Sequence, residues 1–259
     1  MGVNAAAIQF TIVQGDVDHN LSIVRTAVVR AAEAGSRLIV LPEMWSTGFA
    51  YGVLPELAQT MTQVLLDEIA ALSRQYQLVI VGSQPVNAED GRVYNTAHII
   101  DCGEVIAAYR KIHLFSLLGE DRYFKAGEQW CVVDSSVGRI GVIICYDLRF
   151  PELCRRLTLE GAQVICVPAQ WPKPRQEHWR TLIRARAIEN QLYLIAANAC
   201  GRIGKLDLFG MSMIVNHQGE VLAEGAEEPE TIMAALDWEP MSAWRAQIPC
   251  LQDRRPALY

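Results

Sequence analysis

The sequence predicts an α/β layered fold, in which helices cover the faces of β-sheets. Short apolar runs such as LIVLP and QVICVP have the length of buried strands. Between such runs, apolar residues recur at the spacing of a helix face, as at Leu21, Val24 and Val28. Strands and amphipathic helices therefore alternate along the chain, and this order places helices over sheet faces.

The expected elements of the first half follow from its apolar runs and its helix-ending residues. Asn20 is expected to cap the first helix, and Gly35 to end it. In order, the elements are a strand over 5–13, a helix over 21–34, a strand over 38–41, a helix that includes 61–76, a strand over 78–84, and a hairpin-like pair over 92–101 and 105–111. Residues 114–130 show weak periodicity and are expected to form a loop.

The second half continues this alternation from the segment RIGVIICYDLRFPE, residues 139–152. Its strand over 140–144 is followed by a helix over 151–160, a strand over 163–168, a helix over 177–190, strands over 192–198, 210–216, 220–224 and 231–236, and a helix over 238–247. No Gly/Ser/Pro-rich linker divides the chain, so residues 1–259 are expected to form a single domain. The tail over 249–259 lacks a core pattern and is expected at a surface or a subunit interface.

Composition narrows the classes of function. The 259 residues are 51% hydrophobic and 20% charged, which is typical of a soluble globular chain. A formal net charge of -6, without long charged runs, argues against binding to nucleic acid or to an anionic membrane. No apolar stretch reaches the ~18 residues of a membrane span. The N-terminus has no basic start, so a secretory signal is not expected.

Cysteine usage points to a reducing compartment. The seven cysteines form no CxxC pair and have no metal-binding spacing with histidine, so neither a disulfide framework nor a zinc site is expected. The cytoplasm is the expected location. Most of these thiols are expected to be core residues, as at Cys154 on a helix face and Cys166 within VICVP.

Cys145 differs from the other cysteines because polar residues flank it. An apolar strand stops on this thiol and the chain restarts as a helix at Pro151. Such a turn would place Cys145 at the carboxyl end of its strand, where open α/β sheets build their sites. Cys145 is therefore the candidate nucleophile.

Two other expected strand ends supply Glu43 and Lys111. Amide hydrolysis needs a nucleophile, a base that returns the proton to the departing nitrogen, and positive charge over the oxyanion. Glu43 could serve as the base, while Lys111 and the backbone amide of Tyr146 could hold the oxyanion. Loss of one oxyanion donor typically costs about 3 kcal/mol, or roughly a hundredfold in rate, so replacing Lys111 by Ala is expected to reduce turnover far more than it destabilises the fold.

A cysteine-histidine hydrolase is the alternative that these residues leave open. Among the five histidines, only His113 lies beside a candidate site residue. Strand alternation would place it on the same face as Lys111. The serine-hydrolase motif GxSxG is absent from the sequence.

Three blocks, LPEMWSTGF, YRKIHLF and CYDLRFPE, resemble in order and interval the signature blocks of the carbon-nitrogen hydrolase (nitrilase) superfamily. The resemblance extends to RARAIENQLYLIAAN and DRRPALY, and is closest to the omega-amidase branch, which hydrolyses 2-oxoglutaramate and 2-oxosuccinamate to the oxo-diacid and ammonia. It implies a four-layer α-β-β-α sandwich, a homodimer or larger assembly, and neither a metal nor an organic cofactor.

The resemblance also implies roles for particular residues. The catalytic triad of the family falls on Glu43, Lys111 and Cys145, with Cys145 on a sharp strand-to-helix turn. A second glutamate, which orients substrate and assists proton handling, falls on Glu120 within LLGEDRYF.

The substrate end of the site has open alternatives. Arg149 could bind a distal substrate carboxylate, or pair with Asp147 or Glu152 to hold the turn. Phe49 and Trp171 could be pocket walls or core residues. The loop WPKPR, residues 171–175, departs from the small polar residues typical of the omega-amidase branch. An N-carbamoyl hydrolase, a short aliphatic amidase and a catalytically silent scaffold domain therefore remain alternatives.

Overall fold

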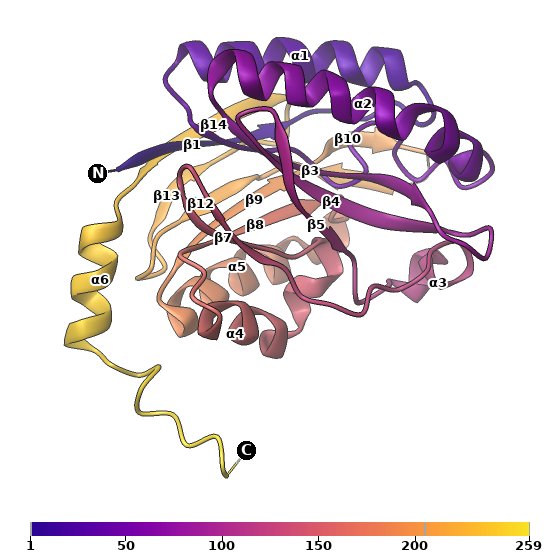
Figure 1. Cartoon of the computed structure of the whole chain (residues 1–259). Helices are drawn as coiled ribbons and strands as arrows, with labels where there is room; N and C mark the ends of the chain where they lie inside the picture. The colour runs from indigo at the N-terminus through magenta and orange to yellow at the C-terminus, as the bar shows by residue number, and fades with distance from the viewer. Residues whose placement is uncertain (1, 205, 259) are drawn as a thin grey trace.

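Two six-stranded sheets pack face to face in the computed structural model, which describes residues 2–204 and 206–258. Two long helices cover the outer face of one sheet, and two helices cover the outer face of the other (Figure 1). The four-layer α-β-β-α sandwich implied by the family resemblance is therefore confirmed.

The first sheet is built from strands of the N-terminal half of the chain and one C-terminal strand, in the order β14-β1-β2-β3-β4-β5. The pairs β1·β2 and β2·β3 are parallel, whereas the outer pairs are antiparallel. The strands are β1 (Val3–Gln9), β2 (Leu38–Val40), β3 (Val79–Asn87), β4 (Val93–Asp101), β5 (Glu104–Arg110) and β14 (Glu230–Leu236).

The second sheet has the order β13-β12-β9-β8-β7-β6, with β7, β8 and β9 parallel. Its strands are β6 (Val132–Ser135), β7 (Gly138–Val142), β8 (Val164–Ala169), β9 (Tyr193–Asn198), β12 (Met213–Val215) and β13 (Val221–Glu224). A separate hairpin, β10 (Cys200–Ile203) and β11 (Leu206–Phe209), extends beyond it.

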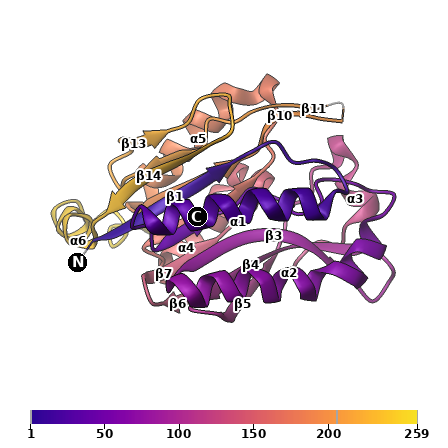
Figure 2. The same ribbon diagram turned by 90° about the horizontal axis from the view of Figure 1, so that it is seen from above.

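The helices cover the two outer faces in pairs. Helices α1 (Val17–Glu33) and α2 (Leu54–Tyr76) lie side by side on the first sheet, as the view from above shows (Figure 2). Helices α4 (Pro151–Leu159) and α5 (Gln176–Asn190) pack on the second sheet. Helix α6 (Trp238–Gln247) lies beside the sandwich rather than in a layer (Figure 1).

Strand alternation divides the apolar residues between two cores. Leu38 and Val40 of β2 face the second sheet, while Ile39 and Leu41 pack beneath α1 and α2. A strand buried on both faces requires apolar residues at every position, which is why its sequence reads as a continuous run instead of an alternating one.

Several predicted boundaries are wrong, and local hydrogen bonds explain one of them. Helix α1 begins at Val17 because Asp16 caps it, accepting from the His19 backbone N–H at 3.1 Å. The Asn20 side chain instead ties the helix to the backbone of Val13 and Ser46. Among the described residues, β6 and the β10·β11 hairpin had no predicted counterpart.

The segment 114–130 is not entirely loop, because it contains a short 3-10 turn, Ser116–Leu118, and the one-turn helix α3 (Glu120–Tyr123). Within the described residues, no helix has both the length and the apolar character that crossing a membrane requires.

Candidate active site

Strand ends from both sheets meet at one place in the sandwich. Glu43 follows β2, and its backbone N–H donates to the carbonyl of Ala169 at the end of β8, at 3.4 Å. Lys111 directly follows β5, and its backbone N–H donates to the Asn95 carbonyl at 2.9 Å. Cys145 follows β7 and opens a 3-10 turn, Cys145–Arg149.

A buried ammonium lies between two carboxylates at the centre of this site. Lys111 Nζ donates to Glu43 Oε1 at 2.8 Å and to Glu120 Oε1 at 2.9 Å. The three residues are at most 2% exposed. Burial alone would lower the pKa of Lys111, but the charges of Glu120 and Glu43 outweigh that effect and raise it well above its usual value. Lys111 therefore stays protonated.

The second carboxylate is held at the start of α3. Glu120 Oε2 accepts from the Phe115 backbone N–H at 3.1 Å. Burial, together with the charge of Glu43, outweighs the attraction of Lys111 and raises the pKa of Glu120 to about 7. Glu120 thus holds a proton more readily than an ordinary glutamate does.

The Cys145 thiol lies within the electrostatic field of these three groups. Burial raises the pKa of the thiol well above its usual value, the Glu43 and Glu120 charges raise it further, and Lys111 opposes them. Cys145 is 8% exposed and lines a cavity with Glu120. The structure therefore brings together Glu43, Lys111, Glu120 and Cys145, which are distant in the sequence.

The turn at Cys145 is strained and braced. Its φ of +46° lies in the left-handed region, which is unfavourable for a residue with a Cβ atom. Asp147, fully buried, braces the turn by accepting from the Ile144 backbone N–H at 2.9 Å and from Tyr109 Oη at 2.7 Å. It also accepts from the His113 backbone N–H at 2.9 Å, which joins the Cys145 turn to the segment after Lys111.

A small cavity lies beside the thiol. Its lining residues come from both halves of the chain and are Phe49, Phe115, Leu118, Glu120, Cys145, Tyr146, Arg149, Gln170, Trp171, Pro172 and Arg175. A second, wider cleft shares none of these lining residues. Six of the eight residues predicted for the site thus border one small cavity. The other two, Glu43 and Lys111, are fully buried and are joined to it through Glu120.

A family model described as carbon-nitrogen hydrolase matches residues 4–246. The chain belongs to the carbon-nitrogen hydrolase family. This carbon-nitrogen hydrolase is 34% identical over 255 residues to a 2-oxoglutaramate amidase of Bacillus subtilis (strain 168), with 98% of each chain covered. It is 32% identical over 265 residues to the chloroplastic omega-amidase of Arabidopsis thaliana, covering 95% of this chain and 71% of the relative.

A solved structure of similar fold shows a modified cysteine. It is a mutant of the amidase from Nesterenkonia sp. AN1, in which the acetamide moiety of fluoroacetamide is covalently added at the active-site cysteine. The TM-score is 0.88 at 29% identity, with 99% of this chain and 95% of that chain covered.

The pocket of the carbon-nitrogen hydrolase contains the residues whose roles the sequence left open. The Arg149 guanidinium lies 4.5 Å from the Trp171 ring centroid, and its Nη1 is 3.2 Å from His178 Nδ1. Within the described residues, no ion pair joins Arg149 to Asp147 or Glu152, so holding the turn by such a pair is excluded. Phe49 and Trp171 are almost fully buried and also border the cavity, so each is both a core residue and a pocket wall.

His113 occupies a different place from the one that strand alternation predicts. Strand β5 ends at Arg110, so the alternation does not continue to His113. The His113 ring stacks on Phe150 with centroids 3.6 Å apart, and its Nδ1 lies 2.7 Å from Asp147 Oδ1. Its role is therefore to brace Asp147.

Two buried residues that the sequence did not single out, Asn95 and Gln170, hold Glu43. Asn95 Nδ2 donates to Glu43 Oε1 at 2.8 Å, and the Gln170 backbone N–H donates to Oε2 at 3.0 Å. Gln170 Nε2 also donates to the Glu43 carbonyl at 2.8 Å. Gln170 follows β8, so the strand-end rule that selected Glu43 could have found it. Asn95 lies inside β4, where the pattern gives no such signal.

Of the residues that the structure describes, no group of three or more histidine, cysteine or acidic side chains is arranged to hold a metal ion.

The brace at Asp147 carries a prediction. In Asp147→Asn an N–H₂ group replaces one carboxylate oxygen and faces donors that this oxygen used to accept from. Because these buried donors lose their acceptor, the free energy of unfolding should fall by roughly 2–3 kcal/mol. The kcat should fall about tenfold, because a loosened turn misplaces the thiol. Urea unfolding and steady-state turnover measure the two effects. The exposed Asp134→Asn is the matched control, and an unchanged urea midpoint in Asp147→Asn would contradict the brace.

Proposed function

We propose that this carbon-nitrogen hydrolase is an amidase that hydrolyses the omega-amide of small 2-oxo acid amides, such as 2-oxoglutaramate and 2-oxosuccinamate, to the oxo-diacid and ammonia. The observation that carries the proposal is the buried Glu43–Lys111–Glu120 cluster beside Cys145, facing a small cavity that also contains the Arg149 guanidinium. The likeness to the Bacillus subtilis 2-oxoglutaramate amidase over nearly the whole chain supports it.

The acylation half of the reaction begins with a neutral thiol, because its raised pKa disfavours a resting thiolate. Glu43 takes the proton as the Cys145 sulfur attacks the amide carbon. Lys111 Nζ and the backbone N–H of Tyr146 stabilise the oxyanion that forms. Glu43 then gives the proton to the amide nitrogen, the carbon–nitrogen bond breaks, and ammonia leaves a thioester.

Deacylation reuses the same base. Glu43 takes a proton from water, and the hydroxide attacks the thioester carbon. The carbon–sulfur bond breaks, the acid is released, and the proton returns to the sulfur. The Asn95 and Gln170 donors keep the Glu43 carboxylate in one orientation through both halves. Glu120 positions the Lys111 ammonium from the opposite side.

Substrate recognition is assigned to the part of the pocket beyond the thiol. Arg149 is proposed to bind the distal carboxylate with its paired N–H donors. Stacking on Trp171 limits the orientations of its guanidinium. Phe49 and Trp171 are proposed as walls that exclude water from the acyl chain.

Ammonia release from a panel of amides tests the function. We expect 2-oxoglutaramate or 2-oxosuccinamate to give the highest kcat/KM, since each carries a carboxylate for Arg149. Faster turnover of N-carbamoyl amino acids or amines, or of short aliphatic amides, would replace this function by one of those activities. No release from any of these amides by reduced protein would favour a scaffold domain.

The raised pKa of Glu120 predicts the pH dependence. The kcat/KM should rise with pH through about 7, because ionised Glu120 adds negative charge near Glu43 and makes Glu43 a stronger base. Stability changes in the opposite sense. Because the pKa in the folded state exceeds the ordinary value of 4.5, the contribution of Glu120 to stability is complete below about 4.5 and is lost as pH rises through about 7.

A matched variant checks the assignment of this ionisation. In Glu120→Gln both the rise in kcat/KM near pH 7 and the fall in stability between pH 5 and 7 should disappear. Initial rates and thermal unfolding across a pH series measure them. A step near pH 7 that persists in Glu120→Gln assigns the ionisation to another group.

We propose further that the chain is one domain, acts as a homodimer in the cytoplasm, and places residues 249–259 at the subunit interface. The match of one family model to residues 4–246 supports the single domain.

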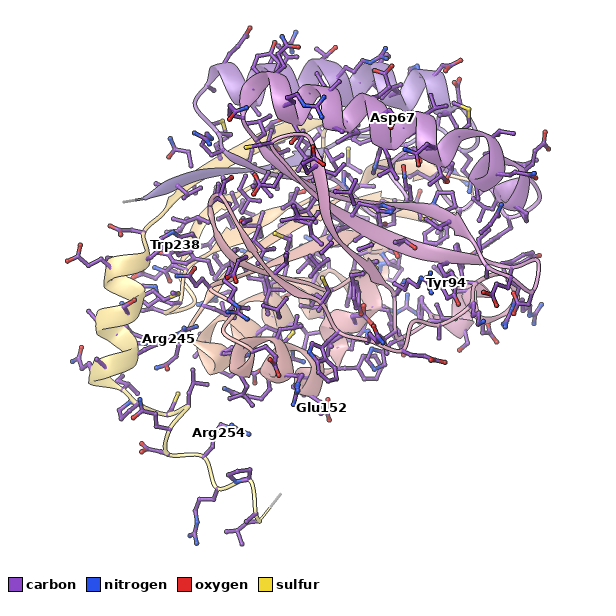
Figure 3. All side chains as sticks on the ribbon, in the orientation of Figure 1. Asp67, Tyr94, Glu152, Trp238, Arg245 and Arg254 are labelled. Carbon is purple, nitrogen blue, oxygen red and sulfur yellow. The ribbon has the colours of Figure 1, made fainter. Side chains whose placement is uncertain are left out.

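All seven cysteines are free, as expected in a reducing compartment. Figure 3 shows Arg254 on a tail that projects away from the sandwich beyond α6. Sedimentation velocity of the full chain and of residues 1–248 tests the assembly.

A further inference from the structure

A second arginine lines the cavity that contains Cys145 and Arg149. It is Arg175, at the end of the 3-10 turn Lys173–Arg175 in the loop WPKPR. The Arg175 guanidinium lies 5.4 Å from the centroid of Phe115, another residue of the cavity wall. Two cationic side chains therefore border the same small cavity.

Backbone hydrogen bonds fix the position of Arg175. Its carbonyl accepts from Trp171 Nε1 at 2.9 Å, and its N–H donates to the Pro172 carbonyl at 3.1 Å. The indole that forms one wall of the cavity thus holds the segment that carries the second guanidinium. The side chain is half-buried, so it is partly shielded from water.

The charges of the two arginines are not neutralised by protein carboxylates. In the described residues, no ion pair involves Arg149 or Arg175, although the neighbouring Lys173 contacts Glu227 at 2.6 Å. The one acid on the cavity wall, Glu120, is already paired with Lys111. Burial, and also the positive charge of Arg175, lowers the pKa of Arg149. The two cations therefore repel each other until an anion enters.

We infer that Arg175 is a specificity-determining residue, which makes the site select amides with a carbonyl oxygen next to the distal carboxylate and reject those with an ammonium at that carbon. The inference rests on the proposed function. It concerns the substituent on the carbon next to the distal carboxylate, whereas the proposed function concerns that carboxylate and the amide.

The chemistry of the two substrate types explains the selection. In 2-oxoglutaramate the carboxylate and the 2-oxo oxygen are on adjacent carbons, and both are hydrogen-bond acceptors. Two neighbouring guanidiniums, which are donors only, can bind them together. Glutamine has the same amide and carboxylate, but its ammonium is a donor and a cation. This ammonium would offer Arg175 no hydrogen-bond acceptor and would repel its positive charge.

The experiment compares three substrates that differ only at this carbon. They are 2-oxoglutaramate, glutaramate with a methylene, and L-glutamine with an ammonium. Two preferences are measured, each as a ratio of specificity constants. In Arg175→Gln, the preference for 2-oxoglutaramate over glutaramate should fall about tenfold, and the preference for glutamine over glutaramate should rise about tenfold. If glutamine turnover is undetectable, its competitive inhibition constant against glutaramate replaces the specificity constant.

Two further variants make the result specific. Arg175→Lys keeps the charge and should keep the rejection of glutamine. Lys173→Gln, in the same turn but outside the cavity lining, should leave both ratios within about twofold of the wild-type values. Melting temperatures check that each variant is folded.

Failure of the inference and failure of the proposed function give different results. If wild type hydrolyses 2-oxoglutaramate but either ratio in Arg175→Gln stays within about twofold of wild type, the inference on Arg175 is overturned and the amidase function stands. The same holds if glutamine neither turns over nor inhibits in Arg175→Gln. If folded wild type releases no ammonia from 2-oxoglutaramate or glutaramate, both are overturned.

Discussion

Replacing Cys145 by Ala should lower kcat by roughly 10⁴-fold or more, because no thioester can form and the remaining groups only orient substrate and water. The melting temperature should change little, because the substitution removes one sulfur atom beside a cavity that already exists. Ammonia release measures the activity. Mass spectrometry of the wild type, quenched during turnover, should show an acyl adduct on the peptide that contains Cys145.

Cys166→Ala is the control for loss of a cysteine as such. Cys166 is fully buried in β8 and does not line the active-site cavity. Its replacement should reduce the free energy of unfolding by about 1 kcal/mol through lost packing and leave kcat near the wild-type value. If Cys145→Ala retained more than about one per cent of the activity, or the acyl adduct formed on another residue, the nucleophile would be wrongly assigned.

Replacing Lys111 by Met should impair both turnover and folding. Loss of the oxyanion donor should reduce kcat by about 10²–10³-fold. Loss of the ammonium also leaves Glu43 and Glu120 buried without their shared cation, which should lower the free energy of unfolding by about 3–5 kcal/mol. The sequence alone led to the expectation that folding would suffer far less than turnover. The complete burial of Lys111 between two carboxylates is the reason to revise it.

A double variant separates the two roles of Lys111. In Lys111→Met/Glu120→Gln one of the two uncompensated charges is gone, so much of the lost stability should return while kcat stays low. Urea unfolding and ammonia release are measured on the same preparations, with Glu120→Gln alone as the matched control. Recovery of activity along with stability would mean that Lys111 acts only through the fold.

Local patterns in the sequence were sufficient to select Glu43 and Cys145. Each follows an apolar run that forms a parallel strand, β2 or β7, so the strand-end rule applies directly. Lys111 follows an antiparallel edge strand, where a terminal lysine is common, so its position became informative only in combination with Glu43 and Cys145. Contacts between the two sheets, such as that of Glu43 with Gln170, have no local pattern because they depend on how the sheets pack.

The sequence was less informative where a residue serves both packing and the site. Asn95 and Asp147 are fully buried polar groups within apolar surroundings, and nothing in their spacing shows which donors or acceptors they meet. The alternation assigned to His113 was wrong because strand β5 ends one residue before Lys111. The side chain of Arg149 could be placed only when the position of Trp171, from another loop, was known.

The division of the site between the two sheets has a consequence for how activity arises during folding. Glu43 and Lys111 follow strands of the first sheet, whereas Cys145 and Gln170 follow strands of the second. A chain with one sheet formed and the other still disordered holds either the base or the nucleophile, never both. Activity therefore requires both sheets to be formed and packed against each other, because neither sheet alone places the thiol beside its proton acceptor.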